Sequence, residues 1–250
     1  MKDNTYLITG ANRGIGLALT TLLLLRPNTT VIATIRTPST STSSLTSLPT
    51  SATSKLIVLP LDFSTPSLHP EIFTAFSDKL VHTHGIKHIN TIIANAGTGT
   101  SFHACTSTPL SSLTENFETN TFGPILLYQT LYPLLTANDS PASENDGEDE
   151  AGERKFILIS SSLGSIAAME GSVPSLAYGI SKAAANYFVR KVHFEEQGVV
   201  AIAVHPGIGV GEPPMSVEES ASGVLEQIDG ATKATTSGSF LSYDGTVIPW

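Results

Sequence analysis

The sequence has a single cysteine, Cys105, among its 250 residues. One thiol excludes an intrachain disulfide, a CxxC redox pair and a zinc site made of several thiolates. Long apolar runs are also missing, since Leu22–Leu25 spans one helical turn and a membrane span needs ~20 residues. The start, Met1–Thr5, has neither the basic region nor the apolar core of a signal peptide. We therefore expect a cytoplasmic protein without a membrane partner.

Basic residues are scarce, with 13 Lys and Arg against 22 Asp and Glu, for a net charge of −9. Nucleic-acid binding needs clustered Lys and Arg against phosphates, so we expect no nucleic-acid partner. Charged residues make up only 14% of the chain, against about 25% in typical globular proteins. A chain of this length fits one large domain, and we predict a single domain over residues 1–250.

Short apolar runs alternate with longer helix-like stretches along the chain. The runs are continuously apolar, as in strands that are buried on both faces, and the intervening stretches are long enough for crossover helices. This pattern predicts an α/β fold, a doubly wound parallel sheet of about seven strands with helices on both faces. The expected strands are 6–8, 31–33, 56–59, 91–94, 156–159, 199–204 and, as a seventh, 239–242.

Two stretches depart from this pattern. From Thr37 to Ser54, 13 of 18 residues are Ser or Thr, a poor composition for a long helix, although Leu45 and Leu48 are spaced to anchor a short one. Residues 137–153 are rich in Asp and Glu and are expected to form a flexible acidic insertion, without the ligand spacing of an EF-hand. His82, His84 and His88 have no cysteine or carboxylate partner nearby, so we predict no metal site.

Three glycines lie between the first expected strand and the first expected helix. The stretch runs from Thr9 to Gly16 and reads Thr-Gly-Ala-Asn-Arg-Gly-Ile-Gly. Gly10 suits a tight turn, Gly14 lets a pyrophosphate approach the backbone N–H groups, and Gly16 lets the helix pack close to the sheet. We predict a dinucleotide site here, formed by Thr9, Gly10, Asn12, Arg13, Gly14, Ile15 and Gly16; the alternative is a flexible turn without a ligand.

The end of the second strand indicates which dinucleotide binds. An Asp or Glu there would bind the ribose 2′-hydroxyl of NAD, whereas an Arg accommodates the 2′-phosphate of NADP. The chain has Arg36 at this point and no carboxylate, and Arg13 supplies a second guanidinium. We predict NADP(H) as the cofactor; the alternative is that Arg36 is only a surface residue.

Further motifs follow in order along the chain. They are Leu61-Asp62, Asn95-Ala96-Gly97, Asn120, Ile159-Ser160-Ser161, Tyr178-x-x-x-Lys182 and His205-Pro206-Gly207. With the glycine turn, they make the chain resemble the short-chain dehydrogenase/reductase superfamily over its whole length, with its Rossmann-type fold. Within it, the segments 160–166, 178–184 and 243–250 are most similar to sniffer-type carbonyl reductases and fungal norsolorinic acid ketoreductases.

The resemblance implies a catalytic tetrad of Asn120, Ser161, Tyr178 and Lys182. Tyr178 and Lys182 are four residues apart in a helical stretch, so they share a face, and a nearby ammonium is expected to lower the pKa of the tyrosine. Tyr178 would then donate a proton to a carbonyl oxygen as hydride arrives. Lys182 would also hold the nicotinamide ribose, and Ser161 would hydrogen-bond the substrate oxygen.

The resemblance also implies roles for residues around this tetrad. Asn120 would hold a water behind the lysine, in a long helix that begins near Leu110. Aligning the serine motif selects Ser161 over its neighbours Ser160 and Ser162, whose alternative role is to bond the local backbone. The remaining cofactor residues would be Asp62, Asn95, Ala96, Gly97, Tyr178, Lys182, Pro206 and Gly207; Asp62 could equally be a turn residue.

The segment after Gly207 differs from the family pattern. Gly211 stands where relatives carry a threonine that bonds the nicotinamide carboxamide, and the stretch before the helix expected at Val217 is short. A short glycine-rich lid predicts an open pocket or a weakly held nicotinamide.

We therefore predict an NADPH-dependent ketoreductase that acts on a bulky carbonyl compound, of polyketide or secondary-metabolite type. The alternatives are a non-redox cyclase or isomerase derived from the same fold, and a protein that senses NADP(H) without turnover. A homodimer or homotetramer is also expected, because helices corresponding to 110–135 and 177–194 commonly pair subunits in this superfamily.

Overall fold

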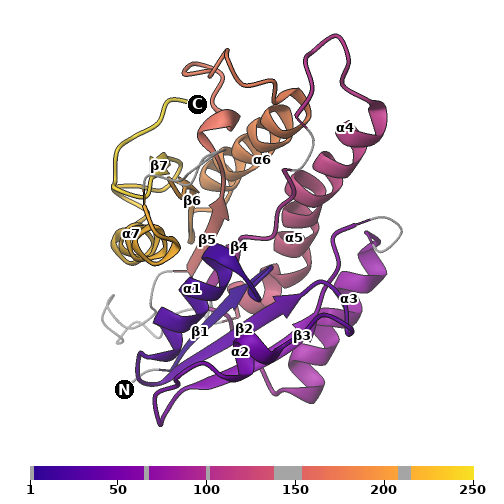
Figure 1. Ribbon diagram of the computed structural model, residues 1–250. Coiled ribbons are helices and arrows are strands. Elements are labelled where there is room, and N and C mark those ends of the chain that lie inside the picture. Colours follow the sequence, from indigo (N-terminus) through magenta and orange to yellow (C-terminus); the bar gives the residue numbers. More distant parts are fainter. Residues whose placement is uncertain (1–2, 65–67, 100–101, 138–153, 208–214) are drawn as a thin grey trace.

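Seven parallel strands form one sheet in the computed structural model, which describes residues 3–64, 68–99, 102–137, 154–207 and 215–250. The strand order is β3-β2-β1-β4-β5-β6-β7 (Figure 1), so the direction of winding reverses between β1 and β4. The strands are β1 Asn4–Ile8, β2 Thr29–Ile35, β3 Lys55–Pro60, β4 Thr91–Ala94, β5 Arg154–Ile159, β6 Val199–His205 and β7 Phe240–Ser242. All seven expected strands are confirmed, and so is the doubly wound α/β class.

Helices cover both faces of this sheet, as predicted. α1 Gly14–Leu24, α2 Ser43–Thr46 and α7 Val217–Gly230 pack on one face, where Leu23, Leu45 and Val224 join one apolar core. α3 Pro70–Asp78, α5 Gly123–Leu135 and α6 Leu176–Glu195 pack on the other, where Phe73, Leu131 and Val189 join a second core. The strands are apolar on both sides because each side faces a helix layer.

The start of α7 shows how local sequence sets a helix boundary. Ser216 accepts a hydrogen bond from the Glu219 backbone at 3.2 Å, and the Glu219 carboxylate accepts from the Ser216 backbone at 2.8 Å. This capping box satisfies two N–H groups that a helix start would otherwise leave unpaired. The short helix α2 is confirmed in the Ser/Thr-rich stretch, where Leu45 is fully buried and holds it on the core.

The helical stretch predicted to begin near Leu110 is α4 Leu110–Phe117, a π-helical turn at Glu118–Phe122, and α5. Insertion of such a wider turn changes which residues face the sheet, and π turns often occur at functional sites. Here it carries Asn120, which is fully buried.

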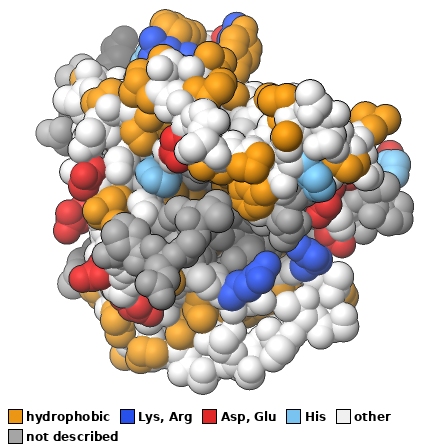
Figure 2. Space-filling model, turned by 45° about the horizontal axis from the view of Figure 1, so that its top comes forward, with side chains coloured by type: hydrophobic (Ala, Val, Ile, Leu, Met, Phe, Trp, Pro, Cys, Tyr) orange, Lys and Arg blue, Asp and Glu red, His pale blue; other side chains and the backbone are white. Residues whose placement is uncertain are grey.

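The surface reflects the low charge of the sequence. On the face in Figure 2, Lys, Arg, Asp and Glu side chains are scattered among larger white and orange areas. No helix in the described part of the chain is both long and apolar enough to span a membrane. The predicted acidic insertion falls at 138–153, outside the described residues.

Candidate active site

The turn between β1 and α1 lies at the carboxyl edge of the sheet, beside the reversal point between β1 and β4. Gly10 has a φ of +64°, a left-handed conformation that favours glycine, and its N–H donates to the Thr34 hydroxyl at 3.3 Å. A Cβ on Gly16 would lie 2.5 Å from the Gly10 carbonyl oxygen, so any larger residue would push α1 away from the turn. Gly10 therefore forms the tight turn that the sequence predicted, and Gly16 allows the predicted close packing of α1.

Thr9 and Asn95 join the ends of β1 and β4. The buried Thr9 hydroxyl accepts from the backbone N–H groups of Asn95 at 3.0 Å and Ala96 at 2.9 Å. The Asn95 amide donates to the carbonyls of Thr9 at 2.8 Å and Gly10 at 3.2 Å. The two side chains thus hold the glycine turn in place, and their contribution to cofactor binding stays a prediction.

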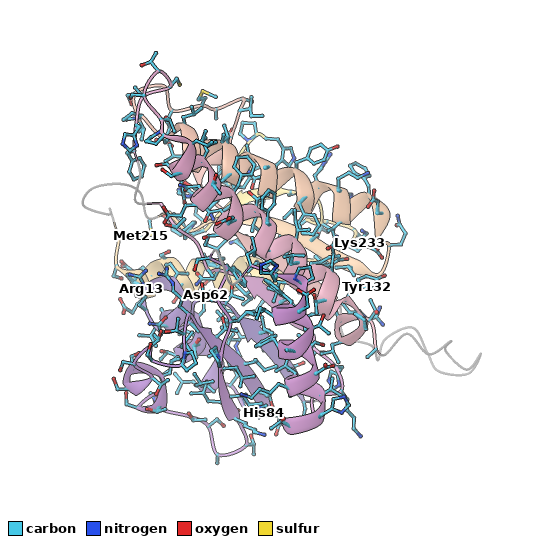
Figure 3. All side chains as sticks on the ribbon, turned by 90° about the vertical axis from the view of Figure 1, so that its right-hand side faces the viewer. Arg13, Asp62, His84, Tyr132, Met215 and Lys233 are labelled. Carbon is cyan, nitrogen blue, oxygen red and sulfur yellow. The ribbon has the colours of Figure 1, made fainter. Side chains whose placement is uncertain are left out.

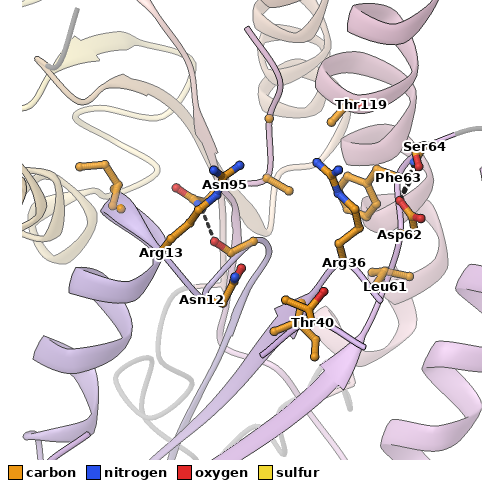
Figure 4. Close-up of a pocket in the computed structure, with 16 residues that line it drawn as sticks. Asn12, Arg13, Arg36, Thr40, Leu61, Asp62, Phe63, Ser64, Asn95 and Thr119 are labelled. Atoms are coloured by element: carbon orange, nitrogen blue, oxygen red, sulfur yellow. Dashed lines mark hydrogen bonds between the residues drawn. The ribbon is translucent and has the colours of Figure 1, made fainter. Parts of the chain in front are cut away.

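A cavity of about 680 Å³ opens over the glycine turn. Arg13 and Arg36 line it from two sides (Figure 4), and both are exposed. Neither has an ion-pair partner among the described residues. The N-terminal end of α1 also borders this cavity, and helix N-termini present unpaired N–H groups that bind phosphate. The sequence-predicted residues Gly10, Asn12, Arg13, Gly14, Ile15, Arg36, Asp62, Asn95, Ala96 and Gly97 all line it.

Asp62 lies at the rim of this cavity, on the same side of the molecule as Arg13 (Figure 3). Its carboxylate accepts from the backbone N–H of Ser64 at 2.9 Å and from the Ser64 hydroxyl at 2.7 Å. It is therefore a turn residue in this structure, and a carboxylate with two donors keeps free lone pairs for a further hydrogen bond.

A second cavity of about 580 Å³ adjoins the first, and the two share Asn95 and Gly97 in their walls. It is lined by Ser161, Tyr178, Lys182, Pro206 and Gly207, all predicted from the sequence. Glu170 and Val173, from the stretch between Ser161 and α6, also lie in this wall. A molecule bound over the glycine turn can therefore extend toward Ser161, Tyr178 and Lys182, three of the four residues of the predicted tetrad.

Tyr178 and Lys182 share one face of α6, as their spacing predicted. The Lys182 ammonium is buried, lies 5.8 Å from the centre of the Tyr178 ring and donates to the Ile159 carbonyl at 2.8 Å. Burial lowers the pKa of Lys182 to about 8, so it releases its proton far more readily than an exposed lysine.

The expected lowering of the Tyr178 pKa is wrong for this structure. Burial raises that pKa, and only a hydrogen bond with Ser161 opposes the rise. The burial comes partly from Gly99, where a Cβ would lie 3.0 Å from the ring, and from Phe102, whose ring centre is 6.4 Å away. Tyr178 is thus held as a protonated phenol, the form that can donate a proton.

Asn120 braces the wall of the second cavity. Its amide nitrogen donates to the Thr98 carbonyl and the Ser181 hydroxyl, both at 2.9 Å, and its oxygen accepts from the Thr98 N–H at 2.9 Å. Ser181 belongs to α6, between Tyr178 and Lys182, so Asn120 connects the loop after β4 to the helix that carries these two residues. The predicted role as a water holder stays a prediction.

The three adjacent serines after β5 have three different partners. Ser160 donates to Asn186 at 2.6 Å, Ser162 donates to Glu170 at 2.7 Å, and Ser161 hydrogen-bonds Tyr178. Ser161 also accepts from the Leu163 N–H at 3.3 Å, which orients its hydroxyl. This arrangement favours Ser161 over its neighbours, as the motif alignment did.

His205 also lines this cavity, although the sequence analysis named it only as part of the His205-Pro206-Gly207 motif and gave it no role. Its Nδ1 accepts from the Ser162 N–H at 3.2 Å, which leaves the ring hydrogen on Nε2. Burial lowers its pKa, so the ring stays neutral at pH 7. Its position as a polar residue at the end of an apolar strand was the available signal.

Two further predictions concern residues outside these two cavities. No group of three metal-ligating side chains exists in the residues that the structure covers, and His84 lies far from Arg13 and Asp62 in Figure 3. The glycine-rich lid with Gly211 falls at 208–214, outside the described residues.

Comparison with known proteins gives a consistent result. A family model described as short chain dehydrogenase matches residues 4–220. Norsolorinic acid ketoreductase nor1 of Dothistroma septosporum is 34% identical over 265 residues, covering 100% of this chain and 93% of the relative. Norsolorinic acid ketoreductase of Aspergillus parasiticus is 33% identical over 265 residues, covering 100% and 92%.

Solved structures agree with these relatives. The NADPH-bound carbonyl reductase from chicken fatty liver superposes with a TM-score of 0.84 at 29% identity, covering 100% of both chains. Carbonyl reductase Sniffer of D. melanogaster superposes with a TM-score of 0.82 at 25% identity, again covering 100% of both.

Proposed function

The chain belongs to the short-chain dehydrogenase family, and from this premise we propose that it is an NADPH-dependent ketoreductase. The observation that carries the proposal is that Ser161 and Tyr178 line one cavity, which adjoins the glycine-turn cavity. Reduction of a carbonyl needs a proton donor next to a hydride-carrying cofactor. Tyr178 in the second cavity can be the donor, and the adjoining glycine-turn cavity can hold the cofactor.

The residues of the first cavity fit NADPH. The turn at Gly10–Gly16 and the start of α1 suit a pyrophosphate, and Gly97 and Lys182 border the passage toward the second cavity, where the nicotinamide would lie. Arg36, exposed and without an acidic partner in the described chain, would pair with the 2′-phosphate, and Arg13 would add a second charge. The similar carbonyl reductase from chicken fatty liver, which is NADPH-bound, supports this choice.

The protein's own part in the reaction is proton transfer and orientation. Bound NADPH supplies the hydride that adds to the carbonyl carbon. Ser161 and Tyr178 hydrogen-bond the carbonyl oxygen, and Tyr178 gives its proton to that oxygen as negative charge develops, which leaves an alcohol and a phenolate. Lys182, with a pKa of about 8, is protonated at pH 7 and stabilises the phenolate until a solvent proton restores the phenol.

The substrate is proposed as a bulky carbonyl compound of aromatic polyketide type. Two relatives are named norsolorinic acid ketoreductases, and the substrate cavity of about 580 Å³ has room for fused rings. The ring of Phe102 beside Tyr178 offers an aromatic wall on which such rings can stack.

The test is NADPH oxidation by the purified protein with a panel of aryl ketones, in parallel for Tyr178→Phe and Tyr187→Phe. Tyr187 lies on the same helix but is 70% exposed, so it controls for loss of a hydroxyl on α6. We expect Tyr178→Phe to lower kcat by at least about a hundredfold with little change in NADPH affinity, and Tyr187→Phe to act like the parent.

Three outcomes separate the alternatives. NADPH-dependent reduction that needs Tyr178 supports the ketoreductase. Turnover of a ketone without NADPH oxidation, retained in Tyr178→Phe, would instead indicate a cyclase or isomerase. Tight NADPH binding with no reduction of any ketone would indicate a sensor.

A further inference from the structure

Glu170 places an exposed carboxylate in the wall of the proposed substrate cavity. It lies in the stretch between Ser161 and α6, outside any helix or strand. The Ser162 hydroxyl donates to Glu170 Oε1 at 2.7 Å and holds the carboxylate beside the residue next to Ser161. A carboxylate accepts about four hydrogen bonds, so Glu170 keeps free acceptor sites when Ser162 uses one.

The other ionisable groups of this wall do not neutralise Glu170. Among the described residues that line the cavity, Lys182 is buried and its ammonium donates to the Ile159 carbonyl. His205 is neutral at pH 7 because burial lowers its pKa, although the charges of Glu170 and Asp244 raise it in part. Among the described residues that line the second cavity, the exposed charge is therefore the negative one of Glu170, whereas the exposed charges of the first cavity include those of two arginines.

A carboxylate in this position distinguishes ligands by charge and by hydrogen-bond donors. It accepts a strong hydrogen bond from a phenol or alcohol, because hydrogen bonds to an ionised acceptor are roughly twice as strong as neutral ones. It repels a carboxylate or other anion on the substrate, and this repulsion weakens with salt because the group is exposed. A ketone with a hydroxyl elsewhere on its ring system can place its carbonyl against Ser161 and Tyr178 and its hydroxyl against Glu170.

We propose that Glu170 is a specificity-determining residue that selects neutral carbonyl compounds carrying a hydroxyl group and disfavours anionic ones. The carbonyl binds Ser161 and Tyr178 while the hydroxyl donates to Glu170. This inference rests on the proposed ketoreductase function and narrows its substrate class to hydroxylated aromatic ketones.

The test uses three ketones of one shape: 6-hydroxy-, 6-methoxy- and 6-carboxy-2-acetylnaphthalene. Reduction by NADPH is measured at low and high salt for the parent, Glu170→Gln, Glu170→Ala and the control Glu226→Gln. Glutamine can still accept from Ser162 but has no charge, so this variant separates charge from support of the loop. Glu226 is an exposed glutamate on α7 and lines neither cavity.

At low salt, the parent should prefer the hydroxy over the carboxy ketone in kcat/KM by at least about tenfold, chiefly through KM. Glu170→Gln should reduce this ratio by about tenfold, chiefly through KM, and remove its salt dependence. Glu170→Ala should also remove the preference of hydroxy over methoxy, and Glu226→Gln should match the parent.

The inference is overturned if Glu170→Gln keeps the parent's ratios, or if it lowers kcat equally on all three ketones, as a purely structural residue would. Thermal shifts of the NADP⁺-loaded protein with each ketone provide a second ranking that needs no turnover. If no ketone is reduced but the binding ranking follows Glu170, the ketoreductase proposal fails and the specificity proposal survives.

Discussion

The side-chain amide of Asn95 donates to the backbone carbonyl of Thr9 at 2.8 Å, across 86 residues of sequence. The hydroxyl of Thr9 in turn accepts the backbone N–H groups of Asn95 and Ala96. These bonds close the carboxyl edge of the sheet at the point where the strand order reverses, which is where open α/β sheets bind their ligands. The position of the glycine turn therefore depends on two side chains that need not touch a cofactor.

Thr9→Val should weaken the hydrogen bonding between the ends of β1 and β4. Valine has the shape of threonine but cannot accept a hydrogen bond, so the Ala96 N–H loses its acceptor in a partly buried position. We expect a loss of about 1–3 kcal/mol in unfolding free energy, together with weaker NADPH binding. Chemical denaturation and NADPH titration measure both. Thr21→Val, which removes a hydroxyl that donates to the Leu17 carbonyl within α1, is the control and should change little.

Arg36→Ala should change the choice of cofactor. A charge-assisted pair with the 2′-phosphate contributes about 1.5–3 kcal/mol, so the Kd for NADPH should rise about 10- to 100-fold while that for NADH stays constant. Thermal shift with each nucleotide provides the measurement. Lys87→Ala removes an equal charge from an exposed position before β4 and serves as the control. An equal loss for both nucleotides would contradict recognition of the 2′-phosphate.

Tyr128→Phe should stabilise the fold. Tyr128 is 6% exposed, its ring packs among Tyr132, Phe156 and Phe188, and its hydroxyl has no hydrogen-bond partner among the described residues. Removing a buried unsatisfied hydroxyl should raise the unfolding free energy by about 1 kcal/mol.

Tyr132→Phe is the matched comparison, one helical turn further along α5. Its hydroxyl donates to Glu196 at 2.6 Å, so its removal should instead cost about 1 kcal/mol. Thermal denaturation of the two variants should therefore move the Tm in opposite directions. A fall in Tm for both would mean that the Tyr128 hydroxyl is satisfied in solution.

Lys182→Met should abolish reduction and yet stabilise the cofactor-free protein at neutral pH. The pKa of Lys182 is lowered by burial to about 8, whereas an unfolded lysine has a pKa near 10.4. Between these values the unfolded state binds more protons, so the parent gains stability as the pH rises from about 8 to about 10.4. Below pH 8 the buried charge costs up to about 3 kcal/mol, and methionine removes that cost.

The pH dependence distinguishes this effect from simple packing. The stability advantage of Lys182→Met should be largest below pH 8 and shrink toward pH 10.4, as measured by urea denaturation across that range. An advantage that does not vary with pH would show that the lysine is not held with a lowered pKa. Lys87→Met, at an exposed site, should give no such trend.

Local patterns in the chain were enough to predict the sheet, the glycine turn and the membership of Tyr178 and Lys182 in one site. Strands buried on both faces must be apolar, and residues four apart on a helix must share a face. These rules depend only on neighbours in sequence. They also placed Arg36 at the end of β2, where it faces the cavity over the glycine turn.

Tertiary packing decided the properties that depend on surroundings. Burial by Gly99 and Phe102, from a distant loop, raises the pKa of Tyr178 where spacing alone suggested the opposite. Packing also gave each of the three serines its own partner and brought His205 to the cavity. Desolvation and hydrogen-bond partners come from groups far apart in the chain, which no local pattern specifies.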